Sequence, residues 1–289
     1  MNLDTLVDCR QLGDRLGDPD WRVFDCRFDL ADTGWGERKY DESHLPGAIY
    51  AHLDRDLSGP ITPTSGRHPL PDPGLLCRWL GQHAVRNDTQ VVVYDDSGGT
   101  MAVRLWWLLR WLGHQRVALL DGGWQAWTQA GLPTQKTLPR PVAATRFRCL
   151  PDWQQVVDSD KILRQHREGG NALLLMDARS AERYRGEVEP IDPVAGHVPG
   201  AINLPLQQNL AADGRFMPAA SLRSLYDQAL AGRPARDVVL MCGSGVTACH
   251  NLLAMEIAGL PGGRLYAGSW SEWIRDPGRP VERGDPPNS

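Results

Sequence analysis

The chain contains two related copies of one sequence. Segments of the first half recur in the second half in the same order, at a spacing of 146 to 153 residues. Because both the order and the spacing are kept, duplication of one domain explains the pattern better than chance. A length of 289 residues also suits two domains of ordinary size. The matching pairs are FDCRF (24–28) with MDARS (176–180), HLPGAI (44–49) with HVPGAI (197–202), SGRHPLP (65–71) with DGRFMP (213–218), VVVYDDSGGTMA (91–102) with VVLMCGSGVTAC (238–249), and LLDGGWQAW (119–127) with RLYAGSWSEW (264–273).

Each copy has the pattern of an α/β domain. Residues 91–94 and 238–241 are short, β-branched apolar runs, which are typical of buried parallel strands. Each run is followed by a glycine-rich turn and a helical pattern, at 101–113 and 248–259. We therefore expect two tandem domains, each a parallel sheet flanked by helices. The expected bounds are 1–139 for the first domain, 140–151 for a proline-rich linker and 152–289 for the second domain.

Composition excludes several classes of protein. The net charge is −4 and the isoelectric point is near 6.1, which argues against a basic nucleic-acid binder. No apolar run approaches the roughly 20 residues of a membrane span, and no secretory signal is apparent, so we predict a cytoplasmic protein whose cysteines stay reduced. The sequence has no C-x-x-C pair, no metal-ligand cluster, no Walker loop and no G-x-G-x-x-G turn opening a helix. It therefore predicts neither a metal nor a cofactor.

The strongest chemical signal is Cys242. It begins the turn between a predicted buried strand and a helix, and the loop that follows consists of Gly243, Ser244, Gly245, Val246 and Thr247. Such a loop points backbone N–H groups inward, and the helix adds the positive end of its dipole. These donors stabilise a thiolate, so Cys242 is the predicted nucleophile. A buried structural cysteine is the alternative interpretation.

The first copy serves as an internal control. Asp95 stands at the position of Cys242, so the sequence predicts one inactive and one active domain. A cysteine-dependent phosphatase would have an arginine at Ala248, and phosphoryl transfer is therefore disfavoured. A non-catalytic binding module is the second alternative, against which the intact Cys242 loop argues.

The motifs DARSAERYRG, GHVPGAINLP and VVLMCGSGVTA together resemble the rhodanese superfamily, and within it the two-domain thiosulfate and 3-mercaptopyruvate sulfurtransferases. The resemblance covers nearly the whole chain. It implies a five-stranded parallel sheet in each domain and a catalytic cysteine in the second. It also implies that the thiolate takes a sulfane sulfur from a small-molecule donor and passes the resulting persulfide sulfur to a cyanide or thiol acceptor, possibly a thioredoxin-like protein.

The same resemblance bears on the donor. Thiosulfate-using members have Arg and Lys after the cysteine, whereas this chain has Gly243 and Ser244, the pattern of mercaptopyruvate-using members. Mercaptopyruvate enzymes resemble one another in two substrate-binding arginines. The first matches Arg183, and the second falls at Ile191, which leaves Arg185 as the nearby substitute. We therefore expect 3-mercaptopyruvate to be favoured, with thiosulfate as the alternative main donor.

Breaking the carbon–sulfur bond of mercaptopyruvate requires proton delivery. The resemblance implies that Ser244 does this together with a histidine and an aspartate from the first half of the chain. These match His68 in GRHPLP and Asp56, or Asp54, in LDRDLS.

Overall fold

The computed structural model describes residues 3–139, 142–170 and 172–285, which form two compact units. The first unit contains residues 1–59, 70–152 and 212–216, and the second contains residues 60–69, 153–211 and 217–289. The segment 60–69 thus belongs to the second unit although it comes from the first half of the sequence. The residues expected as a linker, from 142 onward, belong to the first unit, where the backbone N–H groups of Thr145 and Leu150 donate to Gly81 and Leu112.

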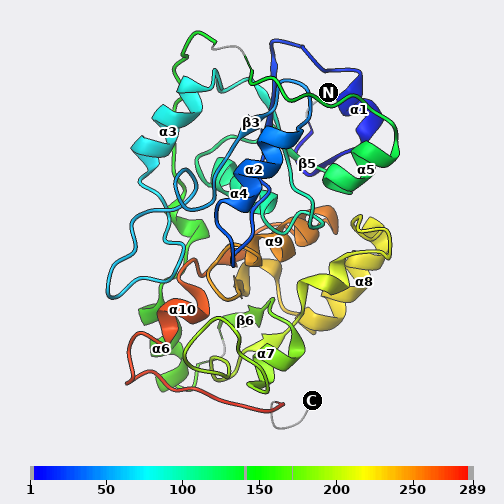
Figure 1. The fold of residues 1–289 in the computed structure, drawn as a ribbon. Helices are drawn as coiled ribbons and strands as arrows, with labels where there is room; N and C mark the ends of the chain where they lie inside the picture. The colour runs from blue at the N-terminus through cyan, green and yellow to red at the C-terminus, as the bar shows by residue number, and fades with distance from the viewer. Residues whose placement is uncertain (1–2, 140–141, 171, 286–289) are drawn as a thin grey trace. The chain divides into compact units, whose positions relative to one another are not determined.

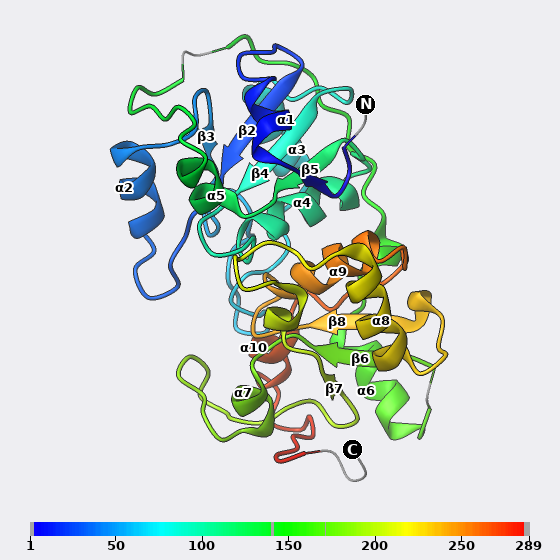
Figure 2. The same ribbon diagram turned by 90° about the vertical axis from the view of Figure 1, so that its right-hand side faces the viewer.

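The first unit contains a five-stranded parallel sheet. Helices lie on both sides of this sheet (Figures 1 and 2). The strand order is β1-β5-β4-β2-β3. Residues Val92 and Tyr94 face a core that Trp127 helps to fill, whereas Phe24 on the opposite face contacts Trp79 with ring centroids 5.4 Å apart. The elements are β1 (Leu6–Val7), α1 (Cys9–Gly13), β2 (Trp21–Asp25), α2 (Trp35–Glu42), β3 (Ile49–Tyr50), α3 (Pro73–Gln82), β4 (Gln90–Tyr94), α4 (Ala102–Trp111), β5 (Val117–Leu120) and α5 (Gly123–Gln129).

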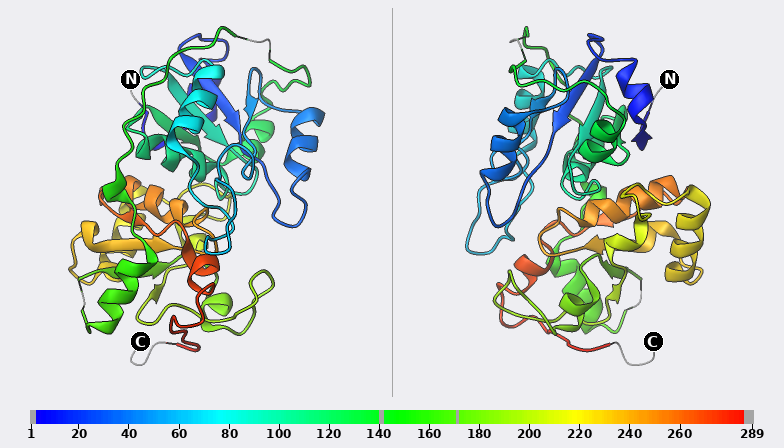
Figure 3. Two further views of the ribbon diagram at one scale, coloured as in Figure 1. Left: turned by 90° about the vertical axis from the view of Figure 1, so that its left-hand side faces the viewer. Right: turned by 45° about the vertical axis from the view of Figure 1, so that its right-hand side comes forward.

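The second unit repeats this architecture with four parallel strands in the order β7-β6-β8-β9. Helices α8 and α9, yellow and orange in Figure 3, pack against each other. Val239 and Met241 face the core that Trp270 and Trp273 help to fill. The elements are η1 (Trp153–Gln155), α6 (Ser159–Arg167), β6 (Leu174–Asp177), α7 (Ala181–Arg185), β7 (Ile202–Asn203), η2 (Leu206–Asn209), α8 (Ala219–Leu230), η3 (Ala235–Asp237), β8 (Val238–Met241), α9 (Ala248–Ile257), β9 (Arg264–Leu265) and α10 (Ser269–Trp273).

The predicted α/β class and the repeated strand–turn–helix units are confirmed. The expectation of five strands in each sheet is wrong for the second unit as described. There a single parallel bridge between Val156 and Leu265 stands where β1 pairs with β5 in the first unit. One bridge does not make a strand, although the N–H of Val157 still donates to Leu265 at 2.9 Å.

The expectation that every cysteine is a free thiol is also wrong. Cys77 of α3 and Cys149 form a disulfide within the first unit, with their Cα atoms 6.2 Å apart. The bond joins α3 to the chain segment just before residue 152 because that segment packs along the first unit. The spacing of 72 residues between the two cysteines carries no signal of this contact. No helix in residues 3–139, 142–170 or 172–285 is long and apolar enough to cross a membrane.

Candidate active site

Cys242 directly follows strand β8, at the carboxyl edge of the sheet where parallel α/β folds place their ligands. Its side chain is buried, and the backbone N–H of Gly245 donates to Sγ at 3.1 Å. Gly245 has a φ of +76°, and a Cβ there would lie 2.1 Å from the carbonyl oxygen of Ala267. Only glycine fits this turn, and the turn is what aims an N–H group at the sulfur.

Helix α10 fixes the backbone around the sulfur. The N–H of Cys242 donates to Ser269 Oγ at 3.1 Å, and its carbonyl oxygen accepts from the N–H of Trp270 at 3.0 Å. The next carbonyl, that of Gly243, accepts from the N–H of Ser271 at 2.9 Å. The nucleophile therefore sits on a loop whose polar backbone groups are held by hydrogen bonds, which is the arrangement expected of a preorganised site.

Ser244 and His68 lie together in the second unit. The Oγ of Ser244 is 2.7 Å from Nδ1 of His68, and both residues are buried. The structure thus brings together two of the residues predicted from sequence for proton delivery. Asp56 lies in the first unit, where its carboxylate accepts from the N–H of His52 at 2.8 Å. Burial raises the pKa of Asp56 above its usual value, although that hydrogen bond opposes the shift.

Arg183 projects from α7 toward the buried carboxylates of Glu189 and Asp192, which no sequence motif indicated as site residues. Its Nη2 lies 2.7 Å from Glu189 and 3.4 Å from Asp192. Glu189 also pairs with Arg179 at 3.4 Å. Burial would raise the pKa of Glu189, but hydrogen bonds from Arg183 and from backbone N–H groups hold it below the usual value. At Asp192 burial prevails and its pKa is raised, in spite of Arg67 and Arg183 nearby.

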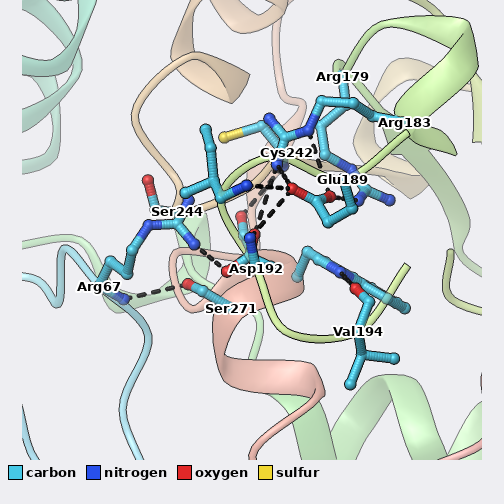
Figure 4. Close-up of polar contacts among 12 residues, drawn as sticks. Arg67, Arg179, Arg183, Glu189, Asp192, Val194, Cys242, Ser244 and Ser271 are labelled. Atoms are coloured by element: carbon cyan, nitrogen blue, oxygen red, sulfur yellow. Dashed lines mark hydrogen bonds and ion pairs between the residues drawn. The ribbon is translucent and has the colours of Figure 1, made fainter. Parts of the chain in front are cut away.

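Arg67 approaches Asp192 from the side opposite Arg183, as Figure 4 shows. Its Nη1 pairs with one carboxylate oxygen of Asp192 and its backbone N–H donates to Ser271 at 3.1 Å. A methyl group built on Gly243 would lie 3.0 Å from Nη2 of Arg67 and 3.6 Å from Nη2 of Arg183. Two guanidinium groups therefore border the residue next to the nucleophile.

The remaining predicted residues lie as follows. Val246 is buried in the loop, and Thr247 immediately precedes α9. Arg185 forms an ion pair with Glu187, an exposed residue, at 2.7 Å. Ile191 is exposed, and its backbone N–H donates to Glu189 at 3.1 Å. Across the described parts of the chain, no group of three or more His, Cys, Asp or Glu side chains is arranged to hold a metal ion.

The corresponding loop of the first unit is filled by its own side chain. Asp95 is fully buried, and its two carboxylate oxygens accept from four backbone N–H groups at 2.8 to 2.9 Å. The donors are Ser97, Gly99, Met101 and Ala102. The loop shared by both units is thus an anion-binding cradle, occupied in the first unit by a carboxylate.

The rhodanese-like domain family matches residues 8–130 and 159–276, one match in each half of the sequence. The chain belongs to the rhodanese family. It is 50% identical over 290 residues to a protein of Pseudomonas aeruginosa named as a probable 3-mercaptopyruvate sulfurtransferase, covering 99% of this chain and 100% of that protein. It is 33% identical to the thiosulfate sulfurtransferase of Mus musculus, covering 90% of this chain and 87% of that one.

Among solved structures, the chain is similar to a 3-mercaptopyruvate sulfurtransferase from Leishmania major. The TM-score is 0.80 at 33% sequence identity, covering 93% of this chain and 74% of that protein. Because these relatives are sulfurtransferases over nearly the whole length of this chain, the chain is an enzyme of the sulfurtransferase class.

Proposed function

We propose that this rhodanese-family enzyme takes sulfur from 3-mercaptopyruvate, holds it as a persulfide on Cys242, and passes it to a thiol or cyanide. The observation that carries the proposal is the contrast within the repeat. In the second unit a buried thiol, with a backbone N–H donating to its sulfur, stands where the first unit has a carboxylate. A sulfur atom in a cradle that accepts anions is suited to alternate between thiolate and persulfide.

The reaction balances without a cofactor. The Cys242 thiolate attacks the thiol sulfur of the donor, so that a sulfur–sulfur bond forms while the carbon–sulfur bond breaks. The electron pair of the broken bond stays on carbon 3 as the enolate of pyruvate. The proton that was on the donor thiol ends on carbon 3, leaving pyruvate and a Cys242 persulfide anion. An acceptor thiol then takes the outer sulfur together with its own proton, or cyanide leaves as thiocyanate, and the thiolate is restored.

Ser244 and His68 are the proposed route for that proton. The distance of 2.7 Å between Oγ and Nδ1 is that of a strong hydrogen bond, and either atom can donate, depending on the histidine tautomer. A hydroxyl two residues from the nucleophile can therefore receive the proton from the donor thiol and return it to carbon 3. That Asp56, or Asp54, takes part in this step remains a prediction from the family resemblance.

The choice of donor rests on charge. The residues after Cys242 are neutral, so a dianion such as thiosulfate finds no cation in that part of the loop. Arg183 supplies a cation for the single carboxylate of mercaptopyruvate; its side chain is 19% exposed and its guanidinium lies beside Gly243. The relative that is 50% identical is named for mercaptopyruvate.

One observation favours thiosulfate as a second donor. The guanidinium groups of Arg67 and Arg183 border the same space beside Gly243, and two cations can serve a dianion. A relative at 33% identity is named for thiosulfate.

Steady-state assays with the two donors and one acceptor test the proposal. We expect a higher kcat/KM with 3-mercaptopyruvate than with thiosulfate. A preference for thiosulfate would overturn the donor assignment and leave sulfur transfer in place. The cytoplasmic location and a thioredoxin-like acceptor remain predictions.

A further inference from the structure

Two guanidinium groups near the nucleophile have N–H groups without a partner. In the described chain, Arg67 uses Nη1 for Asp192, while its Nε and Nη2 make no hydrogen bond. Arg183 uses Nε and Nη2 for carboxylates, while its Nη1 makes none. A methyl group on Gly243 would lie 3.0 Å from Nη2 of Arg67 and 3.7 Å from Nη1 of Arg183. One unpartnered nitrogen of each arginine thus borders the space beside the nucleophile, next to the partnered Nη2 of Arg183.

Asp192 shows that this pair of arginines can share one carboxylate. One of its oxygens pairs with Arg67 and the other lies 3.4 Å from Arg183. The Asp192 side chain is only 4% exposed, whereas the side chains of Arg67 and Arg183 are 24% and 19% exposed. The carboxylate therefore holds both guanidinium groups from the buried side and leaves their other N–H groups accessible to a ligand.

Arg67 is also fixed to the catalytic loop through its backbone. Its N–H donates to Ser271 Oγ, and the N–H of Ser271 donates to the carbonyl oxygen of Gly243. The next residue, His68, contacts Ser244. Two consecutive residues thus bring a cation next to Gly243 and a hydrogen-bond partner to Ser244.

Neighbouring arginines are not placed for this task. Arg179 is 1% exposed, and its guanidinium is bound by Asp177 and by the carbonyl oxygen of Gly196, each at 2.7 Å. Arg185 pairs with Glu187 through both Nε and Nη2.

We propose that Arg67 is the second carboxylate-binding residue of the donor site and acts together with Arg183, with Asp192 as the residue that positions both. This inference rests on the proposed function. The donor carboxylate would lie across Nη2 of Arg67 and Nη1 of Arg183, beside the residue that follows Cys242. Because the carboxylate takes no part in bond breaking, Arg67 acts mainly on binding.

The test compares two donors that differ only in the carboxylate. They are 3-mercaptopyruvate and mercaptoacetone, in which a methyl group replaces the carboxylate. Arg67→Gln should raise KM for mercaptopyruvate by about 10- to 100-fold with kcat within about threefold, the range for a lost charged hydrogen bond. KM for mercaptoacetone should stay unchanged. Pyruvate, the carboxylate product, should inhibit the variant more weakly by the same factor as the change in KM.

Three further variants make the result decisive. Arg67→Lys keeps the positive charge but not the planar set of N–H donors. Its KM for mercaptopyruvate should lie between those of wild type and Arg67→Gln. Arg223→Gln is the matched control, because Arg223 is exposed and pairs with Asp227 on α8 at 2.7 Å. This substitution should leave KM for both donors unchanged. Arg185→Gln tests the competing residue and should resemble the control.

The inference is overturned if Arg67→Gln leaves KM for mercaptopyruvate and inhibition by pyruvate at wild-type values, or if Arg185→Gln produces the change instead. An equal rise in KM for both donors would also overturn it, since that would show a structural role. If the wild type itself does not use mercaptopyruvate, the donor assignment fails first and this inference fails with it.

Discussion

The two units contain the same cradle with different occupants. In the first unit the Asp95 carboxylate accepts hydrogen bonds from four backbone N–H groups. In the second unit the Cys242 sulfur receives one from Gly245. The carbonyl oxygens of both residues accept from equivalent tryptophans, Trp124 at 2.8 Å and Trp270 at 3.0 Å. The loop geometry is therefore common to both units, and the side chain at its first position decides whether the cradle is structural or chemical.

A second difference is an insertion beside the active cradle. In the first unit His44 follows Tyr40 by four residues, with the rings stacked at 4.0 Å. In the second unit the equivalent pair, Tyr184 and His197, is separated by thirteen residues and stacked at 3.8 Å. The extra residues include Glu189 and Asp192. The scaffold is thus unchanged, and the added loop supplies the carboxylates that hold the arginines.

A third difference lies under the loop. Gly123 and Ser269 occupy equivalent positions, and both have a φ of +54°. A Cβ at Gly123 would lie 2.3 Å from the carbonyl oxygen of Asp95, so the first unit requires glycine there. Ser269 has a side chain at the same strained backbone angle, and its hydroxyl accepts from the N–H of Cys242 at 3.1 Å. The active unit tolerates this strain where a hydrogen bond fixes the nucleophile.

The largest expected effect concerns the cradle of the first unit. Asp95→Ala removes a buried carboxylate and leaves four N–H groups without an acceptor. We expect the free energy of unfolding to fall by about 3 kcal/mol, which is more than a hundredfold in the folding equilibrium. Urea unfolding measures this, and kcat at a temperature where the variant stays folded should be close to wild type. Loss of sulfur transfer in folded protein would show that the first cradle takes part in the reaction.

The next largest effect is expected from substituting Arg183, the arginine on α7 beside the Cys242 loop. Arg183→Ala removes a guanidinium group, where the equivalent position of the first unit has Lys39. We expect kcat/KM for 3-mercaptopyruvate to fall by at least about tenfold, from the loss of a charged hydrogen bond. The matched control is Arg223→Ala on α8. Unchanged mercaptopyruvate turnover in Arg183→Ala would contradict the assignment of Arg183 to donor binding.

The smallest effect concerns Asp96, which stands where the active copy has Gly243. Burial, with a further contribution from Asp95, raises its pKa to about 6. The native state therefore binds a proton more tightly than the unfolded state, and stability from this group is lost as pH rises from about 4 to 6. Asp96→Asn should raise the free energy of unfolding by about 1 kcal/mol at pH 7.5, allowing for solvent screening, and leave it unchanged near pH 4. An equal gain at both pH values would show that ionisation is not the cause.

Much of this molecule was predictable from its sequence, because the internal repeat identifies equivalent positions. From the repeat, the sequence predicted the strand–turn–helix unit of each domain and the presence of Asp95 at the position equivalent to Cys242. The glycine loop could be inferred directly from the residues after Cys242, whereas the pairing of Ser244 with His68 followed from motif resemblance.

The rest depends on contacts between distant residues. Arg67 reaches Asp192 across 125 residues of sequence, and Cys149 reaches Cys77 across 72. Glu189 and Asp192 lie in a proline-containing segment that has the composition of a solvated loop, although both side chains are buried. No local periodicity indicates such burial, because ion pairs with arginines rather than apolar packing bring it about.

In the proposed reaction, sulfur is carried on Cys242 and on no residue of the first unit. Mass spectrometry of the full chain, treated with 3-mercaptopyruvate in the absence of acceptor and then digested, tests it directly. We expect a gain of one sulfur, about 32 Da, on the peptide that contains Cys242, and the gain should disappear when an acceptor thiol is added. Cys242→Ser should show no gain and no turnover, whereas Cys9→Ser should behave like wild type. A persulfide on a peptide of the first unit, or turnover that persists in Cys242→Ser, would show that Cys242 is not the sulfur carrier.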